Sequence, residues 1–219
     1  MPGRTCFPFN PLPRETRFGH LRQCPGEPEQ PRSLPFAPHT QHHARKTMIE
    51  LILGGARSGK SRHASERAAS SGLPITLVAT AEALDDEMRE RIAHHRAERP
   101  DGWRTLEVPL DLASAVEAEA HPGQCLVIDC LTLWLTNLML APGADDASVV
   151  AAGDALVAAL SAARGPVLLV SNEVGLGLVP ESELGRRFRD AQGRLNQAVA
   201  RVADRVVFVA AGLPLVLKG

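Results

Sequence analysis

The sequence predicts an α/β fold in which a mostly parallel sheet is covered by helices on both faces. Three observations lead to this prediction. Short apolar runs alternate with helix-like segments from Met48 onward, a pattern typical of parallel strands buried on both sides. A glycine-rich loop follows the first apolar run directly. The chain of 219 residues is 44% hydrophobic and 22% charged, which is enough apolar material for a substantial core.

The first elements surround the glycine-rich loop. Residues 48–53 form a buried strand, and residues 60–71 are predicted to be a helix that ends at a glycine, a natural C-cap. Residues 75–80 form the second strand, and residues 84–98 a helix. This helix has acidic residues in its first turn and basic residues near its end, which suits the helix dipole, and a following proline stops it.

The rest of the chain continues the alternation. Residues 103–108 are predicted to be extended, and residues 110–120 helical. The later strands are short apolar runs, and they are predicted over residues 125–130, 167–171 and 206–210. The later helices are predicted over residues 131–140, 148–163 and 181–203. The strand at 206–210 is the last clear one.

The strongest functional signal is the loop run Gly54-Gly55-Ala56-Arg57-Ser58-Gly59-Lys60-Ser61, which fits G-x-x-x-x-G-K-[ST]. Its glycines let backbone N–H groups converge on phosphate oxygens, and the following helix points its positive end at the same anion. We expect Lys60 to reach the β/γ-phosphates and Ser61 to offer its hydroxyl to Mg²⁺. The alternative is a glycine-rich turn that binds nothing. The flanking strand and helix favour binding of a nucleoside triphosphate.

Polar residues at the carboxyl ends of later strands are further candidates, because ligands of open α/β sheets lie there. Asp129 ends a strand that we expect beside the loop strand, where a carboxylate usually holds Mg²⁺. The alternative for Asp129 is an N-cap of the next helix. Thr80 and Ser171 also end strands. The glycine-rich stretch 174–180 is predicted to be a mobile loop at the substrate end, or else a plain solvent loop.

A histidine pair near the end of the helix at 84–98 is a candidate for chemistry. Consecutive side chains on a helix point about 100° apart, so His94 can face a site while His95 faces solvent. The pair can also be a solvated cap that suits the helix dipole. A catalytic role is favoured by nearby arginines, because a neutral imidazole can attack phosphorus while arginines neutralise the developing charge. These arginines are Arg91, Arg96 and Arg99.

Residues 1–47 differ from the rest. They contain nine of the 17 prolines, four of the eight histidines, seven Arg/Lys and three Glu, which gives this segment a charge of +4 and the remainder −5. The proline density forbids regular structure over most of the segment, and it lacks the apolar run of a secretory signal. We expect a disordered leader or an over-extended start, followed by one domain over residues 48–219.

Composition excludes several classes of function. The net charge of −1 shows no sign of a nucleic-acid-binding surface. No run approaches the roughly 18 apolar residues of a membrane span. The cysteines form no C-x-x-C pair and indicate reduced structural thiols in a cytoplasmic protein. They are Cys6, Cys24, Cys125 and Cys130.

Several sequence blocks together resemble one enzyme family. The blocks are G-G-A-R-S-G-K-S-R-H-A (54–64), L-D-D-E-M (84–88), R-I-A-H-H-R (91–96), R-P (99–100), W-R-T-L-E (103–107), D-C-L-T (129–132), T-N-L (136–138), N-E-V-G-L-G-L-V-P (172–180) and F-R-D-A-Q-G-R-L-N-Q (188–197). The chain from residue 48 to its end resembles the bifunctional adenosylcobinamide kinase / adenosylcobinamide-phosphate guanylyltransferases of cobalamin biosynthesis. The segment 1–47 is outside this resemblance.

The resemblance implies two reactions on one RecA-like α/β domain that assembles as a trimer. First, a nucleoside triphosphate, ATP or GTP, phosphorylates the aminopropanol hydroxyl of adenosylcobinamide. GTP then guanylylates a histidine with loss of pyrophosphate, and the phosphorylated corrinoid takes the GMP. The family's nucleophile corresponds to His94. Its nucleotide contacts correspond to Gly54–Ser61, Ala79, Thr80, Ala81, Arg96, Ala97, Glu98, Arg99, Glu107 and Asp129.

Two other functions fit the phosphate loop. One is a single-function P-loop kinase of a small molecule, in which His94 is only a helix cap. The other is a non-catalytic nucleotide-binding switch or partner-binding ATPase. Covalent labelling by GTP separates the first alternative from the bifunctional enzyme, and corrinoid-dependent turnover separates the second.

Overall fold

The computed structural model describes residues 48–82, 86, 89–90 and 102–219. The strands are β1 (Ile49–Gly54), β2 (Ile75–Ala79), β3 (Arg104–Glu107), β4 (Cys125–Asp129), β5 (Val167–Asn172), β6 (Arg205–Ala210) and β7 (Leu213–Lys218). The helices are α1 (Lys60–Ala69), α3 (Leu112–Glu119), α4 (Leu131–Leu140), α5 (Asp146–Ala162) and α6 (Glu183–Val202). These bounds confirm the six predicted strands and five of the six predicted helices. Most of the helix predicted over 84–98 lies outside the described residues.

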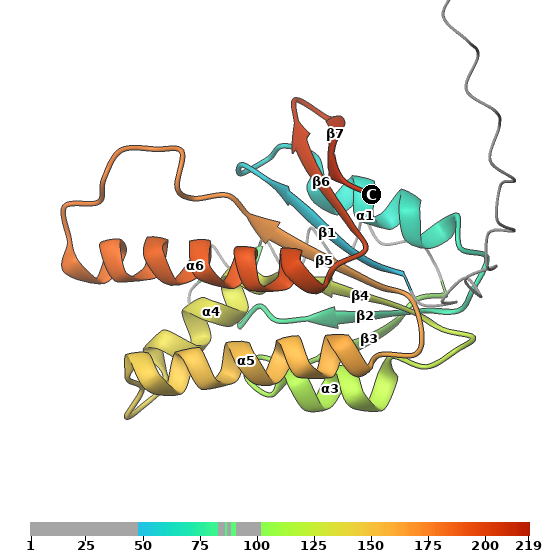
Figure 1. The fold of residues 1–219 in the computed structure, drawn as a ribbon, viewed down its shortest axis with the longest axis horizontal. Coiled ribbons are helices and arrows are strands. Elements are labelled where there is room, and N and C mark those ends of the chain that lie inside the picture. Colours follow the sequence, from blue (N-terminus) through green and yellow to red (C-terminus); the bar gives the residue numbers. More distant parts are fainter. Residues whose placement is uncertain (1–47, 83–85, 87–88, 91–101) are drawn as a thin grey trace, which may run out of the picture. The chain divides into compact units, whose positions relative to one another are not determined.

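The strands form one seven-stranded sheet in the order β3-β2-β4-β5-β1-β6-β7 (Figure 1). Every neighbouring pair is parallel except β6 and β7, which are antiparallel. The carboxyl ends of β1 to β6 therefore lie along one edge, where the loops that follow them can converge on a ligand. Within the described residues, no helix is both long and apolar enough to cross a membrane.

Helices cover both faces of the mostly parallel sheet (Figure 1), so the predicted α/β class is confirmed. α3, α4, α5 and α6 lie on one face and α1 on the other (Figure 1). Side chains alternate along each strand. Leu51 of β1 accordingly packs with Trp134 and Leu160 on the many-helix face, and its neighbour Ile52 packs with Ala64 and Ala68 of α1.

The sequence analysis did not predict β7. Its segment contains Pro214, which argues against a strand with two neighbours. β7 is an edge strand, so a residue without an N–H group is tolerated there. Ala211 and Gly212 connect it to β6 with φ values of 51° and 79°, which is the backbone of a tight hairpin turn. All six residues of β7 are exposed.

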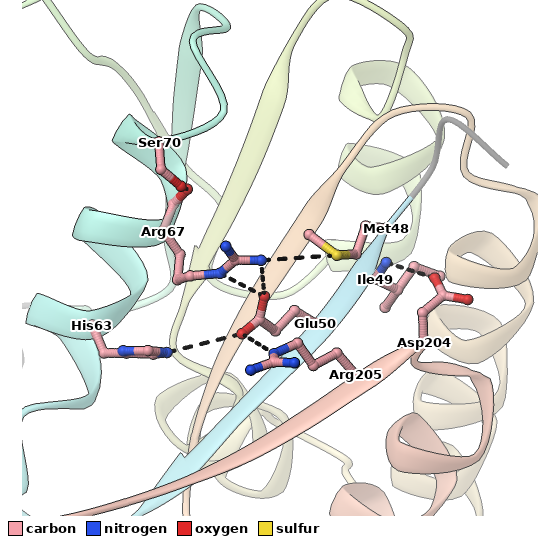
Figure 2. Close-up of polar contacts among 8 residues, drawn as sticks. All are labelled: Met48, Ile49, Glu50, His63, Arg67, Ser70, Asp204 and Arg205. Carbon is pink, nitrogen blue, oxygen red and sulfur yellow. Dashed lines mark hydrogen bonds and ion pairs between the residues drawn. The ribbon is translucent and has the colours of Figure 1, made fainter. Parts of the chain in front are cut away.

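A buried carboxylate joins α1 to the sheet (Figure 2). Glu50 of β1 is fully buried and accepts a hydrogen bond from Arg67 Nε of α1 at 3.0 Å. The same guanidinium also forms an ion pair with it at 2.9 Å. Arg205 of β6 lies 3.4 Å from the other carboxylate oxygen, and His63 of α1 lies 3.9 Å from it. Because a buried charge is tolerated only when it is paired, this cluster holds the helix that follows the phosphate loop.

Candidate nucleotide-binding site

The phosphate loop connects β1 to α1, and two of its glycines are required by its geometry. A Cβ at Gly54 would lie 2.3 Å from the carbonyl oxygen of Val209, so no side chain fits there. Gly59 is the N-cap of α1 with φ of 99°, a conformation that glycine adopts without strain. The Gly212 N–H donates to the Ser58 carbonyl at 2.8 Å, so the turn between β6 and β7 is hydrogen-bonded to the phosphate loop.

The start of α1 suits an anion. Its N-cap, Gly59, has no side chain to accept from the helix amides, and its first turn holds no acidic residue. The first amides of a helix lack partners within the helix, and phosphate oxygens commonly accept from them. Ser58 Oγ is buried and has no hydrogen-bond partner among the described residues. Orphaned donors of this kind at a helix start fit a bound phosphate.

Lys60 places a cation inside this loop. Its side chain is buried, and its Nζ donates to the carbonyl oxygen of Gly55 at 2.6 Å. Burial lowers the pKa of Lys60, while the nearby Cys130 and Asp129 groups oppose that shift. The ammonium group is therefore partly desolvated and lies close enough to Asp129 for their charges to interact. A phosphate bound in the loop would add further negative charge beside this ammonium group and would favour its charged form.

Asp129 ends β4, but β4 is not beside the loop strand as we had expected. β5 lies between β4 and β1, because the order of strands along the chain does not determine their order in the sheet. The helix-cap alternative is also unsupported, since the N-cap of α4 is Cys130 and makes no side-chain cap bond. Asp129 is half-buried at the same edge of the sheet as the phosphate loop.

The donors present fit Mg²⁺ bound together with a nucleotide. Ser61 is in the first turn of α1 and Asp129 is at the strand edge. Mg²⁺ is usually held by one or two protein oxygens plus phosphates and waters, rather than by a full protein cage. The described part of the chain contains no group of three or more His, Cys, Asp or Glu side chains placed to hold a metal ion.

At the carboxyl end of β2, the threonine side chain is bonded within the protein instead of facing a ligand. Thr80 is fully buried, and its hydroxyl bonds to the backbone of Cys130. Ala79 and Ala81 on either side of it are half-buried, and Glu107 at the end of β3 is exposed. Cys125 and Cys130 are buried free thiols, as predicted. Burial raises the pKa of Cys130 to about 11.

A buried polar network at the end of β5 was missed by the sequence analysis. Ser171 donates to Asn196 Oδ1 of α6 at 2.7 Å, and Gln192 Nε2 donates to both of them at 3.0 Å. Asn196 Nδ2 also donates to the Asn172 carbonyl at 3.1 Å. The sequence signal that could have indicated this network is the spacing of Gln192 and Asn196, which lie four residues apart in the helix predicted over 181–203.

The loop after β5 begins beside the phosphate loop. The Glu173 N–H donates to the Gly54 carbonyl at 3.1 Å, and the Asn172 N–H donates to Thr132 Oγ1 of α4 at 2.8 Å. Further along, Leu176 and Leu178 are 80% and 96% exposed. The base of this loop is therefore held from β1 and α4, and its apolar side chains face outward.

The remaining predicted residues lie outside the described part of the chain. They are the nucleophile His94, its neighbour His95, and Arg91, Arg96, Ala97, Glu98 and Arg99. Among the predicted residues that the structure describes, it brings the phosphate loop, with Lys60 and Ser61, and Asp129 to one edge of the sheet.

A parallel α/β sheet with a glycine loop, a buried lysine and a strand-end aspartate defines a P-loop nucleotide-binding protein. Comparison with known proteins gives the particular family. Residues 50–217 match the model of the cobinamide kinase / cobinamide phosphate guanyltransferase family. The chain belongs to this family, as the sequence blocks had indicated.

Three relatives support the assignment. The chain is 55% identical over 172 residues to the bifunctional adenosylcobalamin biosynthesis protein CobP of Pseudomonas aeruginosa, covering 78% of this chain and 98% of that protein. It is 40% and 41% identical over 182 residues to the bifunctional adenosylcobalamin biosynthesis proteins CobU of Escherichia coli and Salmonella typhimurium, covering 78% of this chain and 100% of each relative. A solved structure, the flagellar accessory protein FlaH from Methanocaldococcus jannaschii, is similar with a TM-score of 0.42 and 13% identity over 78% of each chain. The family assignment does not rest on it.

Proposed function

We propose that this protein phosphorylates the aminopropanol hydroxyl of adenosylcobinamide and then transfers GMP from GTP to the product through a guanylyl-histidine. The observation on which this rests most is the family match over residues 50–217. The phosphate loop supports the proposal independently, because both reactions start from a nucleoside triphosphate.

In this proposal each described residue of the site has its own role at the nucleotide phosphates. The amides at the start of α1 bind phosphate oxygens, and Lys60 turns from the Gly55 carbonyl to the β/γ-phosphates. Ser61 and Asp129 would hold Mg²⁺, which when bound would offset the charge that develops on the phosphates during transfer. The remaining proposed nucleotide contacts are Ala79, Ala81, Glu107 and the segment Arg96–Arg99. Thr80 belongs to the same set in the sequence prediction, but its N–H, carbonyl and hydroxyl groups are bonded within the protein, which favours a supporting role. His94 is the proposed nucleophile.

The test is incubation with [α-³²P]GTP followed by denaturing electrophoresis. The proposed enzyme becomes labelled, and the label is stable in base and lost in acid, as expected of a phosphoramidate. A kinase alone takes no label from the α-phosphate. A nucleotide switch shows neither the label nor turnover that depends on added corrinoid.

Asp129→Asn should lower the rate of corrinoid phosphorylation on the order of 100-fold, because the metal loses a charged ligand. The free energy of unfolding should change by less than about 1 kcal/mol, since apolar neighbours pack β4. Steady-state kinetics over a Mg²⁺ series and thermal melts measure the two effects.

The matched control is Asp111→Asn. Asp111 is the N-cap of α3 and accepts from the Ser114 N–H at 3.2 Å, a role that asparagine fills equally well. This variant should keep full activity. Wild-type turnover in Asp129→Asn would show that Asp129 is structural.

We also propose a cytoplasmic homotrimer that binds no nucleic acid. The exposed apolar side chains of β7 support self-association, because an exposed apolar edge strand is a site at which another chain can pair. They are Leu213, Leu215, Val216 and Leu217. The charge of −5 after residue 47 argues against a nucleic-acid partner. Sedimentation equilibrium of the purified protein tests the trimer.

Deletion of residues 1–47 should leave both activities and the melting temperature unchanged. A proline-rich segment without apolar periodicity buries little surface against a domain. Activity assays and calorimetry of the full chain and the 48–219 fragment provide the comparison. A clear fall in melting temperature on truncation would mean that the segment packs on the domain.

A further inference from the structure

We propose that Thr80 and Asn137 are positioning residues, which hold the carboxyl ends of β2, β3 and β4 in the arrangement that aims Asp129 at the nucleotide phosphates. This inference rests on the proposed function, because it assigns the support of the same site. It also gives a physical role to the T-N-L block at 136–138, which the two proposed reactions leave unexplained.

Thr80 joins β2 to β4 just beyond Asp129. Its Oγ1 donates to the Cys130 carbonyl at 2.7 Å and accepts from the Cys130 N–H at 2.9 Å. The Thr80 N–H donates to the Asp129 carbonyl at 3.4 Å. One threonine thus fixes the backbone that directly follows the Cα atom of Asp129. Thr80 is fully buried and Cys130 is 8% exposed, so water does not compete for these bonds.

Asn137 of α4 extends this arrangement to β3. Its Nδ2 group donates to the Thr80 carbonyl at 2.7 Å and to the Pro109 carbonyl at 3.1 Å. Pro109 follows the end of β3, where Glu107 lies. Asn137 is itself buried, with 7% exposure. Two side chains therefore tie together the three strand ends that present Thr80, Glu107 and Asp129.

These bonds also indicate that Thr80 has a supporting role. Its N–H, its carbonyl and its hydroxyl each have a partner within the protein, so its side chain supports the site instead of touching a nucleotide. Thr80 bonds to the backbone that carries the Asp129 carboxylate, so it orients this group through the main chain, and residues that support a metal ligand tune its affinity. A small misplacement of that group costs much of the rate.

The experiment compares Thr80→Val with Thr80→Ser in the full-length protein. Valine keeps the volume and removes the hydroxyl, whereas serine keeps the hydroxyl. We expect Thr80→Val to raise the Mg²⁺ concentration for half-maximal GTP labelling about 10- to 100-fold, with Thr80→Ser within about threefold of wild type. The dissociation constant for GTP in EDTA, measured by calorimetry, should stay unchanged in both variants.

Thr76→Val is the matched control, because Thr76 is a buried threonine of β2 that is paired with Leu126 of β4, away from Cys130. It should leave the Mg²⁺ dependence unchanged. Should Thr80→Val fail to fold, Thr80→Cys gives the same comparison, since a thiol fills the site but bonds weakly. Melting curves report folding for every variant.

Two results would overturn the inference. One is a wild-type Mg²⁺ dependence in folded Thr80→Val. The other is a large loss of GTP affinity in EDTA, which would make Thr80 a direct nucleotide contact. If the wild-type protein takes no label, the proposed function fails. The calorimetric comparison of GTP binding with and without Mg²⁺ still tests Thr80 in that case.

Discussion

Lys60→Ala should abolish corrinoid phosphorylation while leaving the protein folded. The side chain supplies the point charge that faces the β/γ-phosphates, and removing one such group typically costs about 10²- to 10³-fold in rate. The alanine variant also loses the contact between Nζ and the Gly55 carbonyl, which orders the loop. We expect phosphorylation below the detection limit of a radiometric assay.

The stability of Lys60→Ala should be equal to or greater than that of the wild type at neutral pH. Burial lowers the pKa of Lys60 in the folded state, so the unfolded chain binds this proton more tightly than the native state. Folding stability then rises with pH through the window between the lowered pKa and 10.5. Below that window the charged lysine is a cost to folding, and the alanine variant lacks it. Thermal melts across pH measure this difference.

Arg62→Ala is the control for charge on the same helix, because the Arg62 side chain is 71% exposed. It should leave phosphorylation nearly unchanged. If Lys60→Ala still takes up GMP from GTP, the two reactions use separate nucleotide sites. Full phosphorylation by Lys60→Ala would remove this loop from the active site.

The fold could be predicted largely from local pattern, because parallel strands buried on both faces are short apolar runs between helices. Two features of the fold could not be predicted from local pattern. The insertion of β5 between β1 and β4 depends on packing of whole layers. β7 contains a proline that only an edge position tolerates, and edge position is a property of the finished sheet.

The residues of the site likewise fall into those that a sequence motif predicts and those that it does not. The phosphate loop is continuous in sequence, so a motif reveals it. The supporting residues are not continuous: Thr80 bonds Cys130 across 50 positions, and Asn137 bonds Thr80 across 57. Glu50 lies inside the apolar run that predicts the first strand, yet it is the buried partner of Arg67 and Arg205. Such pairs arise only when the sheet assembles.

His94→Ala should eliminate the covalent GMP adduct while phosphorylation of the corrinoid hydroxyl continues. Phosphoryl transfer needs the loop, the metal and a positioned acceptor, and His94 provides none of these. Transfer of GMP through an intermediate needs a nucleophile with a free lone pair near neutral pH. An imidazole with an ordinary pKa of about 6.5 supplies one. Labelling with [α-³²P]GTP and a separate kinase assay measure the two steps.

His95→Ala is the internal control, because consecutive side chains of the helix that the sequence predicts over 84–98 would point about 100° apart. It should retain the adduct. Acidification should weaken labelling of the wild type, since a protonated imidazole has no lone pair with which to attack the α-phosphorus. An adduct that persists in His94→Ala and disappears in His95→Ala would move the nucleophile to His95. Loss of the adduct in both variants with phosphorylation intact would mean that the pair works as a unit, in which one imidazole attacks and the other positions it.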